Sequence, residues 1–248
     1  MTLAAHDLAI AGRLDRVELA LAAGCVTAIC GPNGAGKSTL LAVLAGLLAP
    51  DGGEVRMDGT PLATLPPRER ARAIGYLPQN PEIAWEIDVA TLAGLGRLPW
   101  RTSPGDDRIA VDEALATLDL VPLARRPVSR LSGGERARAL LARVLAGRPR
   151  WVLADEPFAA LDIAHQATLL ARFRALAESG AGVALVIHDL AIARNHADRV
   201  VVLDRGRIVA DGPPDDALAS DRLAAVWGVE ASWLTELGPD GRAALIWR

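Results

Sequence analysis

The sequence contains little cysteine, few aromatic residues and a single lysine among 248 residues. Two cysteines, Cys25 and Cys30, are too few for a disulfide-rich secreted domain, and such thiols are usually buried as small hydrophobic side chains. The longest apolar runs stay well below the roughly 18 residues of a membrane-spanning helix. Residues 1–7 also lack the basic and apolar regions of a secretory signal. These absences predict a cytoplasmic protein with no spanning segment.

An excess of basic charge is also missing. The formal net charge is −3, and acidic and basic residues are mixed along the chain. Because nucleic-acid binding usually requires a basic stripe, we expect no DNA or RNA partner. At 26.0 kDa the chain is long enough for one large α/β domain with a full core.

The single lysine, Lys37, lies in a glycine-rich segment. Its ammonium is a compact charge that fits inside a ring of backbone N–H groups, whereas a guanidinium is a broad planar fork. The segment matches the phosphate-binding pattern G-x-x-x-x-G-K-[ST], the P-loop, in which the lysine reaches the β- and γ-phosphates and the serine hydroxyl binds Mg²⁺. Its members are Gly31, Pro32, Asn33, Gly34, Ala35, Gly36, Lys37, Ser38 and Thr39.

The hydrophobic pattern around this loop predicts an α/β fold with a P-loop NTPase core. Short apolar segments at 17–21, 26–30 and 54–57 indicate an N-terminal antiparallel β subdomain. A leucine-rich helix follows the loop as far as Leu48, and Pro50 stops it. The loop therefore lies between a strand and a helix, as the motif requires.

The rest of the chain adds a helical insertion and a mainly parallel sheet. Residues 81–147 have a helical pattern with Asp88 and Asp106 as expected caps, and we read them as a helical subdomain inserted into the core. Strands that are apolar throughout, as buried parallel strands are, follow at 151–154, 183–187 and 200–203. Residues 213–248 form a short C-terminal appendage, so that residues 1–248 make one nucleotide-binding domain.

Two carboxylates follow the first of these later strands. Asp155 and Glu156 come directly after the apolar residues 151–154, at the edge where open α/β sheets bind their ligands. In combination with the P-loop, this position predicts that Asp155 holds Mg²⁺ and that Glu156 is the general base for water.

A third motif consists of Ser132, Gly133, Gly134 and Glu135. Ser132 and Glu135 fit an S-x-x-E capping box, which opens a helix. Two consecutive glycines disfavour a helix by up to about 1 kcal/mol each, so an anion that approaches the backbone explains them better. With the P-loop and the two carboxylates, the segment resembles the signature sequence of ATP-binding cassette (ABC) ATPases. The resemblance covers nearly the whole chain in the family's order.

The resemblance implies a homodimer whose two cassettes enclose two ATP molecules with Mg²⁺. In such a dimer Ser132, Gly133 and Gly134 touch the γ-phosphate held at the partner's P-loop. Gln79 matches the Q-loop glutamine of the family, which senses Mg²⁺ and the attacking water and couples to the membrane partner. Asp162 matches the aspartate of the D-loop at the dimer interface.

Of the four histidines, His188 has the setting of a functional residue. It follows the strand at 183–187 and matches the family's switch histidine, which contacts the γ-phosphate. His6, His165 and His196 lack such a setting and are expected to be surface or structural residues. No spacing of histidine and cysteine indicates zinc.

The sequence departs from the family at two positions. An aromatic residue upstream of the P-loop normally stacks on adenine, but residues 10–13 contain none, which leaves the Arg13 guanidinium as a candidate. Glu135 stands where glutamine is commoner, and the capping box is expected to hold its carboxylate back from the phosphate.

Further stretches resemble the ATPase subunits of bacterial importers for iron-siderophore, haem and cobalamin. This resemblance implies a peripheral subunit on the cytoplasmic side of the inner membrane. It would act with a multi-span permease and, indirectly, with a periplasmic or lipid-anchored substrate-binding protein. The stretches are residues 65–72, 96–100, 161–166 and 223–229.

Three alternatives remain at this point. The first is transport of another cargo, such as a metal ion. The second is a soluble ABC ATPase without a permease, although the chain has neither the long coiled coil of repair members nor the second cassette usual in ribosome-associated members. The third is a nucleotide-binding regulator without turnover, which the presence of both Glu156 and His188 disfavours.

Overall fold

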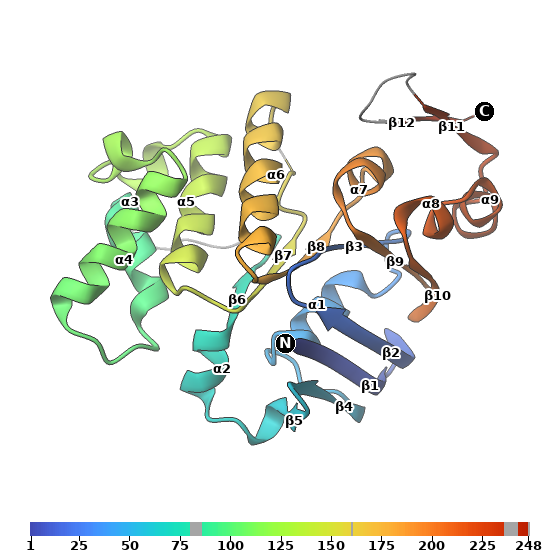
Figure 1. The fold of residues 1–248 in the computed structure, drawn as a ribbon, viewed down its shortest axis with the longest axis horizontal. Coiled ribbons are helices and arrows are strands. Elements are labelled where there is room, and N and C mark those ends of the chain that lie inside the picture. The colour runs from blue at the N-terminus through green and yellow to red at the C-terminus, as the bar shows by residue number, and fades with distance from the viewer. Residues whose placement is uncertain (80–85, 160, 236–242, 248) are drawn as a thin grey trace.

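A six-stranded sheet runs through the middle of the molecule (Figure 1). The computed structural model describes residues 1–79, 86–159, 161–235 and 243–247. Neighbouring strands are parallel except at one edge, where β10 pairs antiparallel with β9. In spatial order the strands are β10 (Arg207–Gly212), β9 (Arg199–Asp204), β3 (Val26–Cys30), β8 (Gly182–Val186), β7 (Trp151–Asp155) and β6 (Ile74–Leu77).

The central strands are buried on both faces. Every residue of β3, β7 and β8 is buried, which agrees with their uninterrupted apolar character in the sequence. Burial raises the pKa of the Cys30 thiol, at the end of β3, to about 12, so this cysteine is an inert core residue. Cys25 is half-buried, and both cysteines are free thiols.

A second sheet, antiparallel and four-stranded, lies beside the first in Figure 1. Its strands, in spatial order, are β2 (Leu14–Ala22), β1 (Thr2–Ile10), β4 (Gly52–Met57) and β5 (Thr60–Pro61). Helix α1 (Lys37–Leu44) shares a buried core with both sheets. The α/β class, with a mainly parallel sheet and an antiparallel N-terminal sheet, is thereby confirmed.

Strand β1 carries only a weak signal in the sequence. Its pairing with β2 shifts register between Ala5 and Leu8, so the alternation of buried and exposed residues is interrupted. Gly53 lies against this bulge, because a Cβ on it would stand 2.2 Å from the carbonyl oxygen of His6. The irregularity therefore involves a glycine on β4, which is distant in the sequence.

Helices gather at one end of the six-stranded sheet (Figure 1). The three longer ones are α3 (Val89–Gly94), α4 (Pro104–Thr117) and α5 (Gly133–Ala146). Short 3₁₀ turns connect them at η2 (Leu95–Arg97), η3 (Val121–Leu123) and η4 (Val128–Arg130). The turn η1 (Leu62–Thr64) and helix α2 (Pro67–Ala73) lead from the N-terminal sheet into β6.

Two predictions at helix ends were wrong. Asp88 does cap α3, accepting from the Thr91 N–H, but Asp106 is not the cap of α4. Ser103 occupies that position, and Asp106 is its partner in a capping box, three residues into the helix. Helix α1 ends at Leu44 and does not extend to Leu48. The backbone leaves the helix at Gly46, where φ is +68°.

The last part of the chain contacts the middle strands β8 and β3 through its first helix and then covers the other end of the sheet (Figure 1). It comprises α6 (Ile163–Glu178), α7 (Leu190–His196), α8 (Pro214–Ala217), α9 (Ser220–Trp227) and a hairpin of β11 (Ala231–Thr235) and β12 (Ala243–Trp247). Asn195 anchors the hairpin, because its side chain exchanges two hydrogen bonds with the Ala243 backbone, at 2.8 and 2.9 Å. The Trp233 indole N–H donates to the carbonyl of Leu218 at 2.8 Å. The C-terminal hairpin is thus a docked element.

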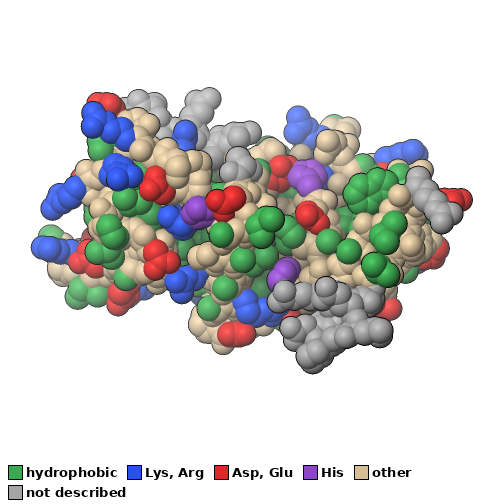
Figure 2. All heavy atoms as spheres, turned by 90° about the horizontal axis from the view of Figure 1, so that it is seen from above, with side chains coloured by type: hydrophobic (Ala, Val, Ile, Leu, Met, Phe, Trp, Pro, Cys, Tyr) green, Lys and Arg blue, Asp and Glu red, His purple; other side chains and the backbone are tan. Residues whose placement is uncertain are grey.

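The surface carries both signs of charge. On the face shown in Figure 2, the described Lys and Arg side chains alternate with Asp and Glu side chains and form no broad basic area. This mixture agrees with the small net charge of −3. Within the described ranges, no helix combines the length and the apolar character needed to cross a bilayer.

The contact between Gly182 and Trp151 gives a test of the core. A Cβ on Gly182 would stand 2.1 to 2.8 Å from three carbons of the buried Trp151 ring. We expect Gly182→Ala to lower the free energy of unfolding by about 1–3 kcal/mol, because the ring has no space to move into. Urea unfolding measures the change.

The matched control is Gly94→Ala at the end of α3. Gly94 has helical φ and ψ angles, and no described atom lies within 4 Å of the position of a Cβ. Alanine should leave the stability of the protein unchanged or raise it by up to about 1 kcal/mol. Equal losses in the two variants would contradict the packing argument.

Candidate active site

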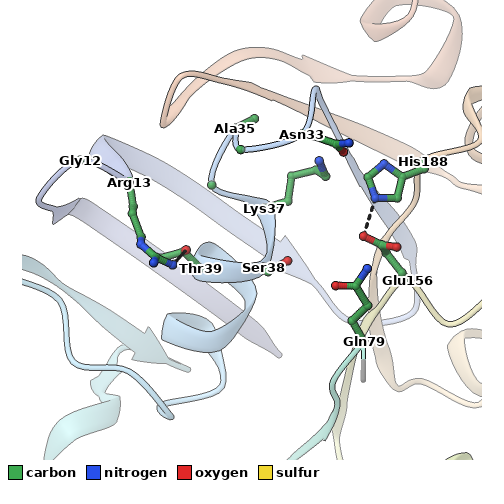
Figure 3. Close-up of a pocket in the computed structure, with 12 residues that line it drawn as sticks. Gly12, Arg13, Asn33, Ala35, Lys37, Ser38, Thr39, Gln79, Glu156 and His188 are labelled. Carbon is green, nitrogen blue, oxygen red and sulfur yellow. Dashed lines mark hydrogen bonds and ion pairs between the residues drawn. The ribbon is translucent and has the colours of Figure 1, made fainter. Parts of the chain in front are cut away.

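A cavity of about 750 Å³ opens where four strands of the parallel sheet end. Gln79 follows β6, Glu156 follows β7, His188 follows β8, and the P-loop follows β3. Figure 3 shows Gln79, Glu156 and His188 on one side of the cavity and Arg13 on the other. The lining residues are Gly12, Arg13, Asn33, Gly34, Ala35, Gly36, Lys37, Ser38, Thr39, Gln79, Glu156 and His188.

Lys37 is held inside the P-loop. Its Nζ donates to the carbonyl oxygens of Gly31 and Pro32, both at 2.8 Å, and the residue is 6% exposed. Burial lowers the pKa of Lys37, while the nearby Glu156 and Asp155 oppose this shift. The ammonium group is therefore a nearly buried charge surrounded by the loop's backbone.

Two glycines shape this loop by close approach to other segments. A Cβ on Gly31, where φ is +147°, would stand 2.1 Å from the carbonyl oxygen of Leu203 in β9. On Gly36, where φ is +102°, it would stand 2.5 Å from the carbonyl oxygen of Arg13. Larger residues would push the loop away from both sheets. The core on either side thus determines the shape of the loop.

Asp155 has the environment of a cation ligand. The residue is 4% exposed, and its Oδ1 is a buried atom without a hydrogen-bond partner among the described residues. Burial raises the pKa of the carboxyl, while a hydrogen bond with the Ser38 side chain lowers it. A buried carboxylate oxygen beside a serine hydroxyl fits the oxygen ligands that Mg²⁺ prefers.

Glu156 and His188 form a pair beside this position. The His188 Nε2 contacts the Glu156 carboxylate directly, as the dashed line in Figure 3 marks. Glu156 has a φ of 51°, an unusual value for a residue other than glycine, which costs of the order of 1–3 kcal/mol. Such strain is found at functional positions, and Glu156 lines the cavity.

The signature residues lie outside the cavity at the P-loop. Ser132 caps α5, and the capping box with Glu135 is complete, as the sequence predicts. The Ser132 N–H donates to Glu135 at 2.8 Å and lowers the pKa of that carboxyl. Glu135 is therefore held back at the helix start. Neither residue lines the described cavity, and the same is true of Asp162, whose side chain is 66% exposed.

The far side of the cavity contains Arg13, the candidate for stacking on adenine, and its neighbour Gly12, which the motifs do not identify. Gly12 and Arg13 come from the turn between β1 and β2, and the Arg13 Nη1 contacts the Thr39 hydroxyl at 3.4 Å. Among the described residues that line the cavity, none is Phe, Tyr or Trp. Gly12 lies far from the P-loop along the chain, which explains why motif spacing could not find it.

Comparison with known proteins identifies the family. A family model described as ABC transporter matches residues 14–159. The chain belongs to this family. It is an ATPase of the ABC type, and the matched range begins at β2 and includes the P-loop, the signature sequence and the two carboxylates. The resemblance inferred from the motifs is thereby confirmed.

Individual relatives are similar over most or all of the chain. A hemin import ATP-binding protein of Nocardia farcinica is 48% identical over 218 residues, which cover 86% of this chain and 75% of the relative. One from Bordetella pertussis is 41% identical over 262 residues and covers 100% of both chains. A solved ABC transporter of the metal-chelate type has a TM-score of 0.86 at 25% identity, covering 100% of this chain and 97% of its own.

The confined position of Lys37 predicts that arginine cannot replace it. We expect Lys37→Arg to lower the ATPase rate by about 100-fold or more, because the wider guanidinium does not fit between the Gly31 and Pro32 carbonyls and the phosphates. The fold should persist, as measured by circular dichroism. Arg108→Lys, a swap at a side chain that is 83% exposed, is the control. Near-normal turnover in Lys37→Arg would contradict the assignment.

Proposed function

We propose that this chain is the ATP-hydrolysing subunit of an ABC importer that takes up haem. The observation that carries this proposal is the similarity, over the full length of both chains, to a hemin import ATP-binding protein at 41% identity. Siderophore-bound iron and cobalamin are the related cargoes that the sequence stretches also allow. The cavity at the P-loop supports the ATPase part of the proposal independently.

Phosphate binding is assigned to the P-loop. Residues 33–39 line the cavity, and the start of α1 adds its positive dipole end. Lys37 supplies the compact positive charge for the β- and γ-phosphates. Its present acceptors are neutral carbonyl oxygens, and hydrogen bonds to anionic phosphate oxygens would be stronger.

The ligands assigned to Mg²⁺ are Ser38, Asp155 and Gln79. The unpartnered Asp155 Oδ1 and the adjacent Ser38 hydroxyl support this set. Bound Mg²⁺ would neutralise charge on the phosphates. Gln79 follows β6 and points toward the same side of the cavity as Glu156 (Figure 3), which suits a residue that contacts both the cation and the attacking water.

Glu156 is proposed as the general base. A water oxygen attacks the γ-phosphorus, the bond to the bridging oxygen of the β-phosphate breaks, and the proton of the water moves to the Glu156 carboxylate. His188 holds that carboxylate through its Nε2 and lies close enough to the cavity to contact the γ-phosphate. Lys37 stabilises the negative charge that develops on the leaving ADP.

A second subunit is proposed to complete the site. Ser132, Gly133 and Gly134 lie outside the chain's own phosphate cavity, and Ser132 and Gly133 are exposed. In a homodimer they would cover the γ-phosphate at the partner's P-loop, with Asp162 at the interface. A bacterial ABC transporter cassette whose solved structure is dimeric supports this arrangement, with a TM-score of 0.77 at 27% identity.

Transport requires further subunits. We assign a multi-span permease as the membrane partner, with Gln79 near its docking position, and a periplasmic or lipid-anchored protein that delivers the cargo. The chain would then work at the cytoplasmic side of the inner membrane. ATP closes the dimer and hydrolysis reopens it, so that the helices α3 to α5 move relative to the sheet and pull on the permease.

Replacing the proposed base separates binding from chemistry. We expect Glu156→Gln to bind ATP with unchanged affinity but to lower kcat by about 100-fold or more, because the amide cannot accept the proton. Fluorescent ATP binding and phosphate release measure the two quantities. Glu178→Gln, at an exposed carboxylate at the end of α6, should keep normal turnover. Unchanged hydrolysis in Glu156→Gln would remove Glu156 from the mechanism.

Reconstitution tests the cargo. We expect the chain to co-purify with a multi-span permease and, in proteoliposomes with the binding protein, to drive ATP-dependent haem uptake that Glu156→Gln abolishes. Siderophore-bound iron, cobalamin and free metal ions are assayed in parallel. Uptake of one of these without haem would change the assigned cargo, and recovery of soluble partners alone would contradict the importer function.

A further inference from the structure

His165 lies between the segment that contains Asp162 and the signature sequence. It is in the first turn of α6, three residues after Asp162, and its side chain is 33% exposed. Sequence patterns leave it as a surface or structural residue. In the fold, its ring contacts the Asp162 carboxylate and also lies close to Gly134 of the signature sequence.

Its first contact is with Asp162. The Asp162 Oδ1 accepts from the His165 backbone N–H at 2.8 Å and lies 2.7 Å from the ring Nδ1. Hydrogen bonds from the His165 backbone and side chain lower the pKa of the Asp162 carboxyl. The backbone bond is an ordinary helix cap, like that of Asp88 on α3, and it does not depend on the side chain at position 165. The ring adds a second restraint on the same oxygen.

The second contact is with Gly134. A Cβ on Gly134 would stand 3.2 Å from Cγ, 3.3 Å from Cδ2 and 3.4 Å from Nδ1 of the His165 ring. The ring therefore packs closely on Gly134, and a Cβ there would force the ring to shift by a few tenths of an ångström. Gly134 is itself fixed in the first turn of α5, whose capping box is complete. The absence of a side chain at Gly134 thus leaves room for the His165 ring of the same chain.

We propose that His165 is a positioning residue that sets the spacing between Asp162 and the signature turn of the same subunit. The inference rests on the proposed function, in which both segments act on the partner's ATP. One imidazole ties the exposed Asp162 carboxylate to the start of α5, so the two groups approach the partner as one unit. Misplacement of such groups by about 1 Å is enough to impair catalysis strongly.

The test uses full-length His165→Ala in two backgrounds. In the Glu156→Gln chain, the dissociation constant of the ATP-dependent dimer should rise about 3- to 30-fold, the range expected when a coupling contact is lost. In the otherwise native chain, the ATP concentration for half-maximal hydrolysis should rise by a similar factor. Binding of fluorescent ATP to the monomer and the Tm should not change, because the helix cap and the P-loop remain intact.

Two conservative variants separate the contacts of the ring. His165→Asn keeps a side-chain N–H for Asp162 but not the ring against Gly134, and His165→Phe keeps the ring but not the N–H. Each should recover part of the loss seen in His165→Ala. His6→Ala, at a half-exposed histidine on β1, is the matched control and should behave like the parent chain.

The outcomes distinguish this proposal from the function on which it rests. A Glu156→Gln chain that stays monomeric with ATP would overturn the proposed dimer and the role of His165 with it. A dimer that forms normally with His165→Ala would overturn the positioning role alone. The positioning role would also be overturned if His165→Ala lowers the Tm, or if it weakens ATP binding to the monomer as much as it weakens the dimer. His165 would then be merely structural.

Discussion

The parallel alignment of β6, β7, β8 and β3 is the constraint on which the site depends. Parallel strands end at the same edge of a sheet, so each delivers the residue that follows it to one place. Gln79, Glu156 and His188 meet the P-loop there although they lie far apart in the sequence. The buried, apolar strands supply the rigidity, because every residue of β7 and β8 packs into the core. Glu156 and His188 therefore follow strands that are buried along their whole length.

Close backbone packing around the P-loop links stability to phosphate binding. Gly31 lies against the Leu203 carbonyl of the six-stranded sheet. Gly36 lies against the Arg13 carbonyl, beside the four-stranded sheet, so the loop is in close contact with both. Within it, Lys37 is nearly buried, and its ammonium is compensated by carbonyl oxygens and nearby carboxylates. A buried ammonium favours an anionic ligand. Phosphate oxygens can offset the free energy of its desolvation, which neutral carbonyl oxygens offset only in part.

The helical subdomain places a second set of groups away from this cavity. Ser132 and Gly134 begin α5, and the His165 ring connects that helix to Asp162 at the start of α6. One chain thus presents a phosphate-binding half and a signature half at different places. This separation is the structural reason for the proposed homodimer, in which the signature sequence of one subunit would face the P-loop of the other. Glu135, the unusual residue of the signature, is occupied by its capping box and remains at the helix start.

The sequence by itself determined what depends on neighbouring residues: the P-loop between a strand and a helix, the capping box, and the carboxylates after β7. These are local because their hydrogen bonds and backbone angles involve residues a few positions apart. Tertiary structure decided the rest. The bulged strand β1, the Glu156 contact with His188 and the packing of His165 on Gly134 all depend on distant segments. Such contacts follow from strand order and core packing, which local patterns do not encode.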